Sequence, residues 1–114
     1  MKLRLTSNQL RLRLNRSEVA ALGKGGALEE RVELEGATVG WTAAAIPGIA
    51  GITARFEDGV VAVRIPAELA SPWASNQEEG LYARQSGLEI AIEKDYECKP
   101  GSEPDAFPNP NKPC

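Results

Sequence analysis

Apolar and polar residues alternate through four stretches of the chain, and each stretch is interrupted near its middle by a two-residue turn signal. In "KLRLTSNQLRLRL" leucines alternate with basic residues on both sides of Ser7-Asn8. A side-chain period of two is typical of β-strands, and a two-residue turn joins antiparallel strands into a hairpin. The same pattern surrounds Glu35-Gly36, Asp58-Gly59 and Ser86-Gly87. The sequence therefore predicts four hairpins.

Each turn also fixes the register of its hairpin, because a slip of one residue would turn every apolar side chain to the wrong face. In all four hairpins the register set by the turn places apolar residues opposite apolar residues. The predicted pairs include Leu5 with Leu10, Val32 with Val39, Phe56 with Val61 and Ala83 with Ile90.

A short helical segment separates the two hairpins in each half of the chain. In "NRSEVAALGKGG" we expect Asn15 or Ser17 as the N-cap and Gly23 as the stop. In "PAELASPWA" we expect Pro66 in the first helical turn, whereas Pro72 shortens the helix.

The turns recur at one interval. Ser7-Asn8 and Asp58-Gly59 are 51 residues apart, and Glu35-Gly36 and Ser86-Gly87 have the same separation. We therefore predict a mainly β (α+β) fold: a tandem duplicated ββαββ unit that forms an eight-stranded antiparallel barrel or a two-sheet sandwich with two short helices. The predicted organisation is one domain over 1–94, with pseudo-repeats over 1–46 and 52–94, and an irregular proline-rich tail over 95–114 docked on it.

Composition narrows the possible functions. Of 114 residues, 42% are hydrophobic and 25% are charged, which is ordinary for a soluble globular protein. A net charge of −3 gives no support for nucleic-acid binding, and the chain has neither a stretch that could span a membrane nor a secretory signal pattern, so we expect a cytoplasmic protein. Histidine is absent, which excludes catalytic pairs built on it.

Basic residues occupy the polar face of the first hairpin and form a candidate anion-binding stripe, consisting of Lys2, Arg4, Arg11 and Arg13. The predicted register sets these like charges opposite one another, so they require compensation. The simpler interpretation is that the acidic face of "LEERVELE" lies on the neighbouring strand and neutralises them.

Glu30 and Trp41 are candidate ligand-binding residues, because the alternation directs Glu30 inward, opposite Trp41. A carboxylate in an apolar cavity could act as an acid or bind a cation. A bulge, or a strand end open to water, would equally explain an inward carboxylate.

The tail "EKDYECKPGSEPDAFPNPNKPC" contains both cysteines of the chain. Asp95 and Phe107 would lie where this tail meets the body, with Phe107 as an anchor. Two thiolates and a carboxylate could hold zinc or iron, so Cys98, Asp105 and Cys114 are candidate metal ligands. The alternatives are a bridge between the cysteines and, as the default in a reducing compartment, free thiols with no cofactor.

Three segments carry a resemblance to a known family, namely "MKLRL…NQLRLRLNRSEVAAL", "ITARFEDGVVAVRIPAELASPWA" and "EKDYECKP…EPDAFPNP". Together they resemble a family of small uncharacterised bacterial proteins, a domain of unknown function. This chain has "KPGSEP" where such relatives carry a longer acidic stretch. The resemblance implies a bacterial cytosolic origin and no particular mechanism.

From the residues we expect a non-enzymatic binding protein, without catalytic residues, that holds a protein or a small molecule where the tail meets the body. A metal protein or enzyme using Glu30, Asp95, Cys98 and Asp105 is the main alternative, and anion binding on the basic stripe is another. The sequence leaves the oligomeric state open.

Overall fold

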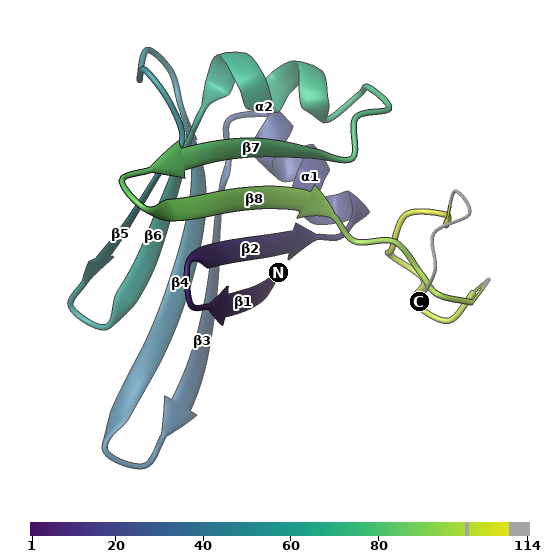
Figure 1. The fold of residues 1–114 in the computed structure, drawn as a ribbon. Coiled ribbons are helices and arrows are strands. Elements are labelled where there is room, and N and C mark those ends of the chain that lie inside the picture. Colours follow the sequence, from purple (N-terminus) through teal and green to yellow (C-terminus); the bar gives the residue numbers. More distant parts are fainter. Residues whose placement is uncertain (100, 110–114) are drawn as a thin grey trace.

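The structure, a computed structural model, describes residues 1–99 and 101–109 and contains eight strands and two helices in that part of the chain (Figure 1). Alternating side chains form the strands, as the period of two predicts. The strands are β1 (Lys2–Thr6), β2 (Gln9–Leu14), β3 (Ala27–Leu34), β4 (Ala37–Ile46), β5 (Thr53–Glu57), β6 (Val60–Pro66), β7 (Gly80–Gln85) and β8 (Leu88–Lys94).

All four hairpins have the predicted register. Leu5 pairs with Leu10 and Phe56 pairs with Val61, while the same agreement holds for the other two hairpins. Two turns need a left-handed backbone at a residue other than glycine, with φ of 52° at Asp58 and 56° at Ser86. The turn residues and the alternation thus specify the same local pairing.

Two sheets form in place of a closed eight-stranded barrel, within the described residues. Their strand orders are β1-β2-β8-β7, called sheet A, and β3-β4-β6-β5, called sheet B. The expectation of an entirely antiparallel arrangement is wrong, because β2 pairs with β8 in parallel and β4 with β6 in parallel. Each sheet combines the first hairpin of one half of the chain with the second hairpin of the other half.

The helices are α1 (Arg16–Gly23) and α2 (Ala67–Trp73). Asn15 is the N-cap of α1: its side chain accepts the Glu18 N–H, and the Glu18 carboxylate accepts the Asn15 N–H, both at 2.9 Å. Gly23 ends α1 beside α2, where a Cβ atom would lie 2.4 Å from the Cβ of Ala74. The glycine is therefore the last residue of the helix, as expected, and its lack of a side chain permits the close approach of the two helices.

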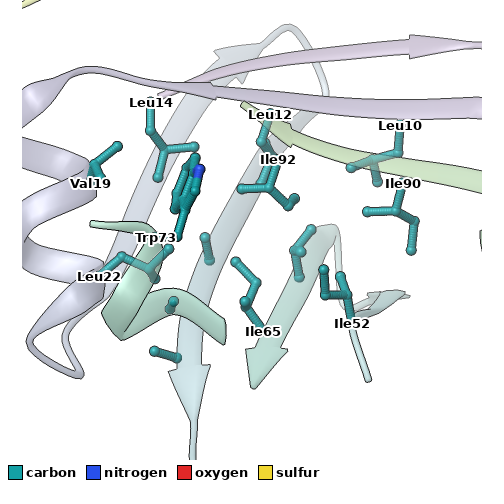
Figure 2. Packing of buried hydrophobic residues seen from close by; sticks show 14 residues of the cluster. Leu10, Leu12, Leu14, Val19, Leu22, Ile52, Ile65, Trp73, Ile90 and Ile92 are labelled. Atoms are coloured by element: carbon teal, nitrogen blue, oxygen red, sulfur yellow. The ribbon is translucent and has the colours of Figure 1, made fainter. Parts of the chain in front are cut away.

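The core lies between the inner faces of the two sheets and is closed at one end by the helices (Figure 2). Sheet A contributes leucines of β2 and isoleucines of β8, sheet B contributes residues such as Ile65, and α2 contributes Trp73, which is almost fully buried. Burying each large apolar side chain stabilises the fold by about 1.5–3 kcal/mol. This packing holds the outer faces and edges of the sheets in place.

Residues after β8 lie against the body at the start of β1 and the end of β2. The Asp95 N–H bonds to the Leu14 carbonyl and the Arg16 N–H to the Asp105 carbonyl, both at 2.8 Å. Phe107 packs against the core, and its N–H donates to the Asp95 carbonyl. None of the described helices is long and apolar enough to cross a bilayer.

Candidate functional site

A hollow of about 340 Å³ opens on the outer face of sheet A, the face turned away from sheet B. Strands β2, β7 and β8 supply its lining, which consists of Gln9, Arg11, Tyr82, Ala83, Arg84, Glu89, Ile90 and Ala91. Its volume lies in the range of sites for small ligands.

The hollow exists because a small residue lies between two long ones. The register places Ala91 of β8 directly between Arg11 of β2 and Tyr82 of β7. Side chains on one face of neighbouring strands are about 5 Å apart, so the short Ala91 side chain leaves space between its neighbours. The guanidinium and the phenol ring therefore stand on opposite sides of the hollow.

Glu93 holds these two side chains in position. The Tyr82 hydroxyl donates to its carboxylate at 2.8 Å, and Arg11 Nε lies 3.1 Å from the other oxygen. Partial desolvation and the hydrogen bond to Glu93 raise the pKa of Tyr82 to about 12, so the phenol stays protonated at neutral pH. Arg11 Nε is buried and makes no hydrogen bond to any described residue, despite its contact with Glu93.

The lining residues next to this group, Gln9, Glu89 and Arg84, lie side by side on the three strands, and their charges cancel. Arg84 donates to Glu89 at 2.6 Å, as the hairpin register predicts, and Gln9 lies beside Glu89 in the parallel pairing. Around the hollow, Arg4 and Arg13 are exposed and form no ion pair with any residue that the structure describes. Positive charge therefore exceeds negative charge on the Arg11 side.

The predicted basic stripe does occupy one face of the first hairpin, but its expected neutralisation by "LEERVELE" is wrong. That segment is β3, which lies in sheet B, whereas the neighbour of β2 is β8. Compensation comes instead from Glu93 for Arg11, and from Asp95 and Glu103 for Lys2, at 2.8 and 3.1 Å. Hydrogen bonds to Asp95 and Glu103 raise the pKa of Lys2.

Glu30 lies opposite Trp41, as predicted, and contacts a cation. Its carboxylate lies 3.1 Å from the α-amino group of Met1, which also pairs with Glu18. Trp41 Nε1 donates to the Met1 carbonyl at 3.1 Å. Glu30 and Trp41 therefore do lie together, and both contact Met1, which joins the start of β1 to sheet B.

Where the tail meets the body, side chains of the tail and the body contact one another. Lys94 is buried, its ammonium lies 5.5 Å from the ring centroids of both Trp73 and Phe107, and it donates to the Asn76 carbonyl at 2.7 Å. Desolvation lowers the pKa of Lys94. Asp95 is engaged by Lys2. These contacts are the ones expected of a docked segment, and the junction's role as a binding site stays a prediction.

Cys98 is disulfide-bonded, which differs from the default expectation of free thiols. The chain's other cysteine, Cys114, lies outside the described residues. Among the residues that are described, no group of three or more cysteine or acidic side chains is arranged to hold a metal ion. The Asp105 backbone carbonyl accepts the Arg16 N–H, a contact that does not involve the Asp105 carboxylate. Because a disulfide-bonded Cys98 has no thiolate, a zinc or iron site using these cysteines stays a prediction for the reduced chain.

Comparison with known proteins gives one match. A family model described as a family of unknown function, DUF7009, covers residues 1–111. The chain belongs to this family. No curated protein and no solved structure matches it. Membership in DUF7009 confirms the resemblance to a domain of unknown function and leaves the activity to be inferred from the site.

Sequence reasoning missed most of the hollow. The hairpin register that pairs Ala83 with Ile90 also implies that Arg84 and Glu89 lie on the outer face, but Tyr82, which is 60% exposed, was not among the predicted site residues. The available signal was Ala91, a small residue in an outward position between glutamates. The pairing of β2 with β8, which brings Arg11 to that position, has no local signature.

Proposed function

We propose that this protein is a non-enzymatic binding module whose outer face of sheet A takes a small anionic ligand. The observation that carries the proposal is the arginine that lines the hollow: the Glu93 carboxylate lies 3.1 Å from the buried Nε of Arg11 and so fixes the position of a guanidinium that borders the hollow. Two unpaired arginines, Arg4 and Arg13, lie on the same face.

The geometry favours a carboxylate or phosphate group at the Arg11 side. A guanidinium binds such oxyanions through parallel N–H donors, and its charge persists at any physiological pH. Glu93 restricts the rotamers of Arg11, which lowers the entropy lost on binding. At the other end of the hollow Arg84 is already paired with Glu89 and offers no free positive charge to a second anionic group, so the ligand has one charged end.

The rest of the ligand is apolar or aromatic. The exposed ring of Tyr82 forms one wall, and Ala91 and Ile90 contribute the apolar part of the lining. Because the Tyr82 hydroxyl is committed to Glu93, the ring offers a flat surface for packing. Phenyl phosphate has this chemistry and is a suitable probe.

The test is a titration with phenyl phosphate, followed by chemical shifts of backbone amides and by the melting temperature. We expect shifts centred on β2, β7 and β8 and an increase in melting temperature. Arg11→Gln should remove both effects, whereas Arg31→Gln should not, because Arg31 is an exposed arginine on sheet B paired with Glu29. An unchanged response in Arg11→Gln, or an equal loss in both variants, would contradict the proposal.

We also infer that the two halves of the chain arose by tandem duplication. In support, pairing positions of matching hairpins differ by 51 at both partners: Leu3 with Leu12 corresponds to Ala54 with Val63. The same offset relates Glu30–Trp41 to Leu81–Ile92. Applied to the strand orders, the offset converts sheet A into sheet B.

The cytoplasmic and bacterial assignments stay predictions. A stable disulfide is unusual in a reducing compartment, so the bond at Cys98 does not favour the cytoplasm.

A further inference from the structure

Sheet A covers only part of sheet B, and the uncovered part is apolar. In Figure 1 the hairpin of β3 and β4 extends well past β1, the edge strand of sheet A. On inner-facing positions, burial falls toward the turns: Ala43 is fully buried, whereas Val32 and Leu34 are 41% and 58% exposed. Phe56, at the end of β5, is 69% exposed. We call Val32, Leu34 and Phe56 the overhang.

β1 borders this region with an unpaired edge. It pairs with β2 alone, and the two-residue turn makes Thr6–Gln9 and Arg4–Arg11 the hydrogen-bonded pairs. The backbone amides of Leu3 and Leu5 therefore point away from β2, and neither bonds to another element of the described chain. The Leu5 side chain is itself 57% exposed.

An open edge beside an uncovered apolar face is the arrangement used for strand addition. A further strand on β1 would satisfy the outward amides, and its inner side chains would lie over the overhang. Its outer side chains would lie beside Arg4, which has no ion-pair partner among the described residues. That position favours an acidic side chain, because opposite charges on neighbouring strands stabilise a sheet.

We propose that the β1 edge binds an extended segment of another protein in which acidic and apolar residues alternate. This surface shares Arg4 with the surround of the hollow of sheet A, but it uses none of the residues that line the hollow and does not depend on a ligand there. The charges argue against a second copy of this chain pairing through the same edge, because two β1 strands side by side would oppose basic residues to basic residues.

The probe is a fluorescein-labelled peptide, GEVELEVEG with blocked ends, and its binding to the full chain is measured by anisotropy. A matched peptide with lysine in place of each glutamate should bind more weakly. Arg4→Glu should weaken binding of the acidic peptide by about fivefold, as expected for reversal of a cross-strand charge pair. Arg31→Glu, a charge reversal on sheet B, should leave binding unchanged.

Side-chain and backbone contributions are separated by two further measurements. Leu5→Ser should abolish binding, whereas Leu69→Ser should not, because Leu69 is a similarly exposed leucine on α2. Methylation of the peptide nitrogens at alternate residues should abolish binding in one pattern and spare it in the other, since only one set of amides can face β1.

Three results would overturn the proposal. The first is the absence of binding by the acidic peptide, and the second is an equal loss with both methylation patterns, which would mean simple adhesion to apolar surface. The third is self-association of the chain that Leu5→Ser abolishes, which would assign this edge to a second copy.

Discussion

The α-amino group of Met1 links three elements that lie far apart in the sequence. It pairs with Glu18 of α1 and with Glu30 of β3, while the Met1 carbonyl accepts a hydrogen bond from Trp41 of β4. Burial lowers the pKa of this amine, but hydrogen bonds and charges from the two glutamates outweigh that effect and raise it above 8.0. The inward carboxylate of Glu30 therefore serves as a counter-ion for the chain's own amine.

Replacing Glu30 by Gln should lower the free energy of unfolding by about 1 kcal/mol or less at pH 7, because the carboxylate is partly exposed. Since the amine's pKa is raised on folding, its stabilisation is complete below pH 8.0 and is lost as the pH rises through the folded pKa. Urea titrations of wild type and variant should therefore converge at alkaline pH.

Glu33→Gln is the control, because Glu33 forms no ion pair within the described residues. A Glu30 effect that persisted after acetylation of the amine would mean that the carboxylate acts through another contact.

Hairpins illustrate how far local sequence specifies an element. Turn type, alternation and register agree in all four, so each hairpin was predicted to the residue. The partner of each hairpin was not predictable in the same way. Both β3 and β8 present glutamates to a basic neighbour, so charge alone could not choose between them. The choice depends on long-range packing of the inner faces, which leaves no local pattern.

Replacing the serine by glycine should have opposite effects on stability in two of the hairpin turns. Ser86 has a φ of 56°, a strained value for a residue with a Cβ, whereas Ser7 has no positive φ. Ser86→Gly should raise the free energy of unfolding by about 0.5 kcal/mol through relief of this strain. Ser7→Gly should lower it by a similar amount, because glycine only adds entropy to the unfolded chain there.

Thermal and urea unfolding of the two variants check this pair of predictions. Destabilisation of equal size in both would show that the backbone at Ser86 carries no strain.

At the scale of the whole molecule, both halves of the chain share one core because each sheet is built from one hairpin of each half. Each half contributes a hairpin to each sheet, so neither half can bury its apolar faces without the other. The alternation predicts that each half of the chain has two hairpins with one apolar face each. It does not predict that each sheet combines hairpins from both halves, because a barrel and either kind of sandwich would bury the same residues. The hollow and the β1 edge both result from that combination, which is why neither was visible in the sequence.

The segment after β8 extends this shared core, and Phe107 tests how much it contributes. Its ring packs against the core and lies 6.0 Å from the ring of Tyr96, and its N–H bonds to the Asp95 carbonyl. Phe107→Ala should therefore lower the free energy of unfolding by about 2 kcal/mol, less than for a fully buried phenylalanine.

Phe56→Ala is the matched control, because its ring is 69% exposed and its removal should change stability by less than about 0.5 kcal/mol. Both variants keep the disulfide at Cys98, so urea unfolding under non-reducing conditions compares the rings alone. If the two substitutions had equal effects on the free energy of unfolding, the Phe107 ring would contribute no more to the core than an exposed ring does. The contacts of Lys94 and Asp95 would then not depend on Phe107.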